Sequence, residues 1–262
     1  ASRTAMLFER EDTKVELGPT LRKLVTAARF NPSLPYLSFL CINFDAPVVQ
    51  EAASWFLDAV FLNYNSSYLE RMLEQMLDEG DSREVTRFLR AVDVRIDGFR
   101  VERAPEWRGQ RVFVRHEVGG KSYELRLSEE SAGTQKLMGL AAYLMTALER
   151  GGTVVVDELD AKLHPKLLRY VILLFKDPEV NKSGAQLIFS SQDVSTMRND
   201  VFRRDEIWFA ARGEGEASQL WSLADIHEAN GNLVSKNAAF DKQYLSGRYG
   251  ADPYLTCIEE WD

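Results

Sequence analysis

Two adjacent carboxylates, Asp157 and Glu158, are the residues of this 262-residue sequence that most clearly suggest chemistry. They follow Thr153-Val154-Val155-Val156, a short apolar and β-branched run that indicates a buried strand. Open α/β sheets bind their ligands at the carboxyl ends of strands. A first acid there can hold Mg²⁺, and a second can take a proton from an attacking water. Acids also follow strands by chance, so the pair alone does not decide between function and a plain loop.

A small-residue turn, Glu130-Ser131-Ala132-Gly133-Thr134-Gln135, opens a long helical pattern that runs from Thr134 to Arg150. Backbone N–H groups at a helix N-terminus attract anions, and glycine lets a phosphate approach closely. The plain alternative is an ordinary cap, with Ser131 as the capping residue and Gly133 accommodating the turn. Taken by itself, the turn favours that alternative.

The order in which the turn and the acids occur along the chain favours a functional interpretation more than either feature does alone. Gly133 precedes Asp157 by 24 residues (157 − 133), which is room for one helix and one turn. The string Leu159-Asp160-Ala161-Lys162-Leu163-His164-Pro165 follows the acids. A second apolar strand, predicted over Ala185–Phe189, then ends in Ser190-Ser191-Gln192-Asp193.

In this order and spacing the sequence resembles the C-terminal lobe of ABC-type ATPases, specifically the RecF/SMC/OLD-like branch. The resemblance implies that Asp157 and Glu158 are the Walker B acids, Asp160 to His164 the D-loop and Ser190 to Asp193 the switch region. It also implies Mg-ATP as the ligand, bound between two copies of the chain. The residues expected to act are Glu158 and Gln192 in catalysis, Asp157 on Mg²⁺, and Ser131, Gly133, Thr134, Asp160 and His164 around ATP, with Ser131 and Gly133 forming the signature turn.

Three further stretches make the resemblance more specific, namely Leu7 to Arg10, Arg203 to Phe209 and Tyr244 to Ala251. They are similar to a bacterial subfamily of ABC-type "ATP/GTP phosphatases" that often occurs in phage-defence neighbourhoods. Because the signature turn serves the partner's nucleotide in such proteins, we expect Ser131 and Gly133 to be exposed and well away from Asp157 and Glu158 of the same chain.

Two departures from the family pattern matter. The sequence has no Gly-x-x-x-x-Gly-Lys-Ser/Thr phosphate loop, and the nearest string, Arg115 to Ser122, continues into a strand-like alternation, so it predicts a hairpin turn at Gly119-Gly120. We expect the chain to lack the N-terminal lobe and to bind ATP poorly alone. The switch residue, usually histidine, is Gln192, which can donate a hydrogen bond but cannot carry a proton. His164 can substitute or, as a D-loop residue, contact the partner; His116 and His227 have no partner evident in the sequence.

The elements that position these residues fall into two portions. Residues 1–91 are mostly helical, and residues 92–262 hold a β-hairpin region and the ABC-type lobe. Helices are predicted over Pro47–Phe61, Ser67–Leu77, Ser82–Ala91 and Pro165–Phe175, and strands over Val92–Val101, Arg111–Val118, Ser122–Leu127 and Glu206–Ala210. Strands that alternate with helices indicate an α/β fold with a mainly parallel sheet, preceded by helical and antiparallel β segments.

Composition restricts the partners. The net charge of −8, from 32 basic and 40 acidic residues, argues against nucleic acid as the main ligand. No apolar run approaches the ~20 residues that cross a bilayer. The two cysteines have no metal-ligand spacing, which fits a reducing cytoplasm.

The sequence therefore favours an ATPase that closes as a dimer and acts on a partner such as a nuclease or toxin. Two alternatives stay open: an ATP-gated scaffold with little hydrolysis, which Gln192 favours, and a DNA-maintenance ATPase of the RecF or SMC type.

Overall fold

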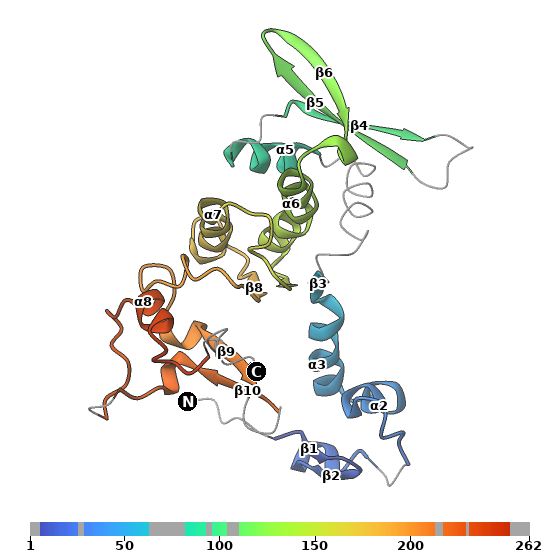
Figure 1. The fold of residues 1–262 in the computed structure, drawn as a ribbon. Helices are drawn as coiled ribbons and strands as arrows, with labels where there is room; N and C mark the ends of the chain where they lie inside the picture. The colour runs from blue at the N-terminus through green and yellow to red at the C-terminus, as the bar shows by residue number, and fades with distance from the viewer. Residues whose placement is uncertain are drawn as a thin grey trace, which may run out of the picture. The chain divides into compact units, whose positions relative to one another are not determined.

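The computed structural model describes residues 6–25, 29–62, 82–92, 96–103, 110–212, 217–228 and 231–251 (Figure 1). The chain divides into two compact units, Ala1–Val60 and Phe61–Asp262. The helix predicted over Ser67–Leu77 lies outside the described residues.

The first unit combines a β-hairpin with three helices around an apolar core. Strands β1 and β2 pair antiparallel. The elements are β1 (Phe8–Glu11), β2 (Lys14–Leu17), α1 (Pro19–Arg22), α2 (Tyr36–Asn43) and α3 (Pro47–Asp58). Buried apolar side chains hold them together, namely Leu21, Tyr36, Leu40, Ala46 and Val49.

Helix α3 ends earlier than the sequence predicts. The apolar periodicity continues to Phe61, but the helix ends at Asp58 and strand β3 (Val60–Leu62) follows. β3 joins β7 in a sheet, and the backbone N–H of Asp157 donates to the carbonyl of Leu62 at 3.0 Å. Pairing within the sheet therefore overrides the helical pattern at this point.

A three-stranded sheet in the order β3-β7-β8 is the centre of the second unit. Strands β7 (Thr153–Val156) and β8 (Gln186–Phe189) are parallel, with Val154 opposite Leu187. The crossover between them contains helix α7 (Pro165–Lys176), and helix α6 (Ala132–Arg150) precedes β7. This arrangement confirms the predicted α/β fold class.

An antiparallel sheet precedes this α/β layer. It consists of β4 (Gly98–Arg103), β5 (Gln110–Val118) and β6 (Lys121–Arg126), in the order β4-β5-β6, and the single turn η1 (Leu127–Glu129) leads from it into α6. Helix α5 (Ser82–Ala91) packs on α6, as Figure 1 shows. The sequence places a boundary near residue 92, whereas this packing groups α5 with the second unit.

The last part of the chain has its own apolar core. Strands β9 (Trp208–Arg212) and β10 (Ser218–Ser222) pair antiparallel, and η2 (Arg204–Glu206), η4 (Leu223–Asp225) and α8 (Phe240–Leu245) surround them. The sequence predicts a strand over Glu206–Ala210, and the structure has one that begins two residues later, at Trp208. This strand, β9, does not extend the parallel sheet, because it pairs with β10, its near neighbour in sequence. The core residues are Ile207, Phe209, Leu223, Val234, Phe240 and Tyr249.

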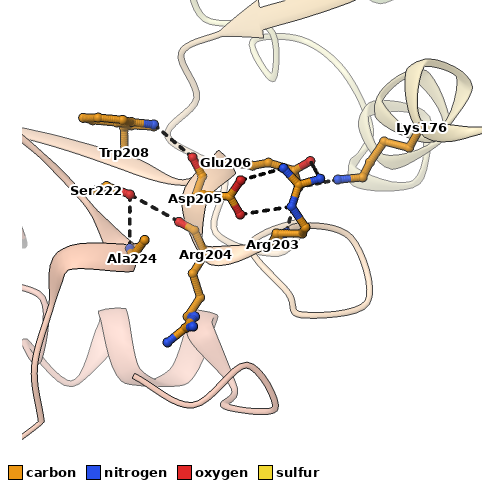
Figure 2. A network of polar contacts seen from close by, with 8 residues as sticks. All are labelled: Lys176, Arg203, Arg204, Asp205, Glu206, Trp208, Ser222 and Ala224. Carbon is orange, nitrogen blue, oxygen red and sulfur yellow. Dashed lines mark hydrogen bonds and ion pairs between the residues drawn. The ribbon is translucent and has the colours of Figure 1, made fainter. Parts of the chain in front are cut away.

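Polar contacts of residues 203–206 connect this C-terminal part to the end of α7 (Figure 2). The Glu206 carboxylate accepts hydrogen bonds from Lys176 Nζ at 2.5 Å and from the backbone N–H of Arg203 at 2.7 Å. Arg203 also forms an ion pair with Asp205 at 2.6 Å. Within the described part of the chain, no helix is both long and apolar enough to cross a bilayer.

Candidate active site

The two acids predicted from the sequence lie at the end of β7, where the end of the parallel strand β8 holds them. Ser190, the first residue after β8, donates from Oγ to Asp157 Oδ1 at 2.5 Å and accepts from the backbone N–H of Glu158 at 2.8 Å. Its backbone N–H donates to Val156 O, and its carbonyl accepts from Leu159 N–H, each at 3.0 Å. One serine therefore fixes the side chain of the first acid and the backbone of the second.

The backbone turns sharply at the second acid. Glu158 has a φ of +51°, in the left-handed region that non-glycine residues seldom adopt. Both Asp157 and Glu158 are exposed. An exposed acid held in a sparsely populated conformation is typical of a functional position, where surrounding contacts sustain the strain.

The loop after β7 and the loop after β8 also meet at Asp160. Its Oδ2 accepts a hydrogen bond from the backbone N–H of Gln192 at 3.2 Å. Its Oδ1 is buried and has no hydrogen-bond partner within the described structure. The side chain of Gln192 is exposed. The structure therefore brings Asp157, Glu158, Asp160 and Gln192 together.

The small-residue turn is the N-terminus of α6. Ser131 is exposed and caps the helix, because its Oγ accepts from Thr134 N–H at 3.2 Å and lies 2.8 Å from Thr134 Oγ1. This is the capping role that the sequence offered as the plain alternative. Capping leaves other first-turn N–H groups of α6 without an intrahelical acceptor, and such groups suit an anion.

A close backbone contact within the chain explains why position 133 is a glycine. A Cβ at this position would lie 2.8 Å from the backbone oxygen of Lys162, closer than real Cβ atoms come to other atoms. The Ser131–Gly133 turn thus packs against Lys162 of its own chain, four residues after Glu158. Its separation from the Asp157 and Glu158 carboxylates stays a prediction. Glycine is needed there because the two backbones approach closely.

Lys136 is the residue that sequence reasoning missed. It lies in the second turn of α6, it is 3% exposed, and its Nζ donates to the carbonyls of Glu158 at 3.0 Å, Leu159 at 2.8 Å and Ala161 at 2.6 Å. Burial lowers its pKa to about 7, against the opposing effect of the Asp160 and Glu158 carboxylates. The available signal was a single lysine that begins an otherwise apolar, buried stretch of helix.

Two histidines take structural roles at the rim of this region. His164 is the N-cap of α7, where its Nδ1 accepts from Lys166 N–H at 3.2 Å, and its side chain is exposed. His116, for which the sequence shows no partner, lies on β5 with Nε2 at 2.6 Å from Glu130 Oε1. Glu130 directly precedes the signature turn, so the antiparallel sheet is tied to that turn.

The string that resembles the end of a phosphate loop is a hairpin, as predicted. Gly119 and Gly120, with φ values of +59° and +74°, connect β5 to β6, and Val118 pairs with Lys121. A two-residue turn with both φ values positive matches the twist of the paired strands. No helix follows it to present N–H groups to a phosphate.

The donor set fits Mg²⁺ bound together with a polyphosphate. Among the described residues no group of three or more His, Cys, Asp or Glu side chains could hold a metal alone. Mg²⁺ in nucleotide sites keeps several waters and is held by one or two carboxylates plus substrate phosphates. Asp157 supplies such a carboxylate, with Oδ1 anchored on Ser190 and Oδ2 directed to no protein partner that the structure records.

The comparison with protein families agrees with this geometry. Residues 29–198 match the family model described as "AAA domain, putative AbiEii toxin, Type IV TA system". The match spans 170 of 262 residues (198 − 29 + 1). The chain belongs to this AAA family. The matched segment includes every residue singled out above from Ser131 to Gln192, so the site lies in a P-loop ATPase-type domain. A search of curated proteins finds no match.

Proposed function

We propose that the protein binds Mg-ATP between two copies of the chain, hydrolyses it, and uses the cycle of closing and opening to gate a partner effector. The observation that carries the proposal is the acid pair at the end of β7, held by Ser190 in a domain of the AAA family. The family match supports ATP binding and hydrolysis. The dimeric site and the effector go beyond it.

Each acid has one role in this proposal. Asp157 is anchored through one carboxylate oxygen and holds Mg²⁺, which neutralises charge on the phosphates as the anhydride breaks. Glu158 is exposed and next in sequence, where it takes the proton from the attacking water. Gln192, beside Asp160, donates its side-chain amide to the γ-phosphate or the water.

The composite site rests on two features of the chain. Ser131 is exposed at the N-terminus of α6, a 19-residue helix whose first turn is suited to an anion. The acids follow β7 and are also exposed, so a second copy can present its turn to a nucleotide held there. These 262 residues contain no phosphate loop, and the proposal therefore requires that loop from outside them.

The family description, which names a putative toxin of a toxin–antitoxin system, supports a toxic activity as the output of the cycle. We propose that ATP-driven closure controls a nuclease or toxin activity, as in phage defence. The net charge of −8 favours a protein partner over nucleic acid.

Mixing two inactive variants tests the shared site. In the complete gene product, Ser131→Arg blocks the signature turn and Asp157→Asn removes the metal ligand, so each variant alone should hydrolyse no ATP. In a mixed dimer one of the two sites carries neither lesion, and random mixing should restore about a quarter of the parental turnover. Activity that stays at the background of the single variants would contradict a site shared between two copies.

A second candidate is an ATP-gated scaffold in which hydrolysis is incidental. The exposed Gln192 favours it, because glutamine cannot carry a proton as the usual histidine does. In this case Gln192→His should raise turnover while leaving ATP-dependent assembly at its parental level. A true ATPase that uses Gln192 for positioning should instead lose turnover on this change.

A further inference from the structure

Lys136 places a buried amino group where an apolar residue would serve packing better. The residues that follow it in α6, Leu137 to Leu144, are all buried, and apolar packing alone accounts for them. A buried ammonium is unfavourable unless hydrogen bonds compensate for the lost hydration. Here the compensation comes from one short segment, the loop that contains both the proposed base and the D-loop.

Three carbonyls of that loop converge on one nitrogen. Lys136 Nζ donates to Glu158 O, Leu159 O and Ala161 O at 3.0, 2.8 and 2.6 Å. An ammonium has three N–H donors, and these three carbonyls can accept one bond from each. Carbonyls that point to a common centre constrain the dihedral angles between them, and φ is positive both at Glu158 (+51°) and at Lys162 (+60°).

The contact between Gly133 and Lys162 reinforces this link from the other side. The backbone oxygen of Lys162 lies 2.8 Å from the position that a Cβ of Gly133 would take, so the first turn of α6 also packs on the loop. The N-terminal half of α6 therefore holds the loop at both ends: Lys136 at residues 158–161 and Gly133 at residue 162.

We propose that Lys136 is a positioning residue that sets the direction of the Glu158 side chain by fixing the backbone of the 158–161 loop through its three carbonyls. The inference rests on the proposed ATPase function and deepens it. Lys136 touches no reacting atom. It acts through the loop, and a displacement of the base by about 1 Å can slow an enzymatic step on the order of 10²-fold.

Two substitutions separate positioning from packing. Lys136→Met keeps an unbranched apolar stem but removes the terminal nitrogen and all its donors, whereas Lys136→Arg keeps a donating cation with a different shape. Lys182→Met is the matched control, since Lys182 is exposed and lies outside the loop. Each variant of the complete gene product is compared by ATP turnover, by KM for Mg-ATP and by amide hydrogen exchange of residues 158–163.

The expected result is a coupled change in rate and loop protection. Lys136→Met should lower kcat about 10- to 100-fold with a smaller change in KM, and amides of residues 158–163 should exchange faster while those of β7 keep their protection. Lys136→Arg should recover part of both losses, and Lys182→Met should behave as the parent. Parental loop exchange in Lys136→Met, whether its turnover is reduced or unchanged, overturns the inference.

A measurement on the unaltered protein covers the case in which Lys136→Met does not fold. Acetylation of lysines by a small amine-reactive ester, followed site by site with mass spectrometry, should modify Lys136 far more slowly than Lys182. Equal rates overturn the inference, because a nitrogen bound to three carbonyls is not free to react. Glu158→Gln, assayed in parallel, isolates the proposed function: parental turnover in that variant refutes the assignment of Glu158 as the base, and loop exchange in Lys136→Met still decides the fixing of the loop.

Discussion

Ser190→Ala is the substitution whose effect follows most directly from the contacts around the acids. It removes the 2.5 Å bond from the serine hydroxyl to Asp157 and the acceptor, at 2.8 Å, of the Glu158 N–H. A hydrogen bond to a charged group contributes about 1.5–3 kcal/mol and a neutral one about 1 kcal/mol. Both acids are exposed, so water replaces part of each bond and the lower end applies. At that lower end the loss is roughly 1.5 kcal/mol, which corresponds to about 10-fold in rate.

The assay is kcat/KM for Mg-ATP in the complete gene product, with thermal unfolding measured beside it. The loss should appear in kcat/KM, and the unfolding midpoint should change little, because water can reach both acids. Ser191→Ala is the matched control, since the Ser191 hydroxyl accepts from Asp193 N–H and touches neither acid in any recorded contact. Parental kcat/KM in Ser190→Ala, or an equal loss in Ser191→Ala, would refute the reasoning.

Two further predictions concern stability. Gly133→Ala places a Cβ 2.8 Å from Lys162 O, so the D-loop must move, and the free energy of unfolding should fall by about 1–3 kcal/mol; an unchanged thermal midpoint would contradict the close approach. Burial raises the pKa of Glu206, but hydrogen bonds such as that from Lys176 outweigh it and hold the pKa below its usual value. Glu206 therefore stabilises the fold above its unfolded pKa, and this contribution disappears as the pH falls through the folded pKa. Unfolding midpoints between pH 6 and pH 3 should fall more steeply in the parent than in Glu206→Gln, with Glu179→Gln following the parent; parallel curves for the parent and Glu206→Gln would show that the contact contributes nothing.

Local sequence patterns predicted most elements of the second unit because glycine and proline residues mark where these elements begin and end. Gly151, with a φ of +84°, ends α6 where the sequence indicates, and Gly119-Gly120 forms the predicted hairpin. Pro165 begins α7. Each of these residues has a backbone preference that acts within a few positions, so the sequence alone suffices.

The elements that were predicted wrongly, β3 and β9, depend on strand pairing between distant parts of the chain. β3 continues an apolar helical pattern and becomes a strand only because β7 lies beside it. β9 has the composition of a sheet strand, but nothing local says whether it pairs with β8 or with β10. Long-range pairing of this kind is a tertiary effect that outweighs propensity.

In the candidate site, too, local sequence patterns predict some residues, whereas others depend on tertiary contacts. The order and spacing of motifs predicted which residues would gather at the end of β7, and the structure brings Asp157, Glu158, Asp160 and Gln192 together there. The residues that hold them were harder to find. Lys136 donates to backbone oxygens of the loop, so no side-chain motif marks these partners.

The most direct measurement of the central claim is ATP turnover and ATP-dependent sedimentation of Glu158→Gln in the complete gene product. Glutamine keeps the size of the side chain and its hydrogen bonding but cannot accept the proton, and loss of a general base lowers the rate about 10²–10⁴-fold. Binding should persist, because Asp157 holds the metal, so the variant should accumulate as a closed dimer with ATP. Asp157→Asn, the control, should lose Mg-ATP binding and the dimer together. Parental turnover in Glu158→Gln would contradict the account and leave Glu158 a structural acid at the end of β7.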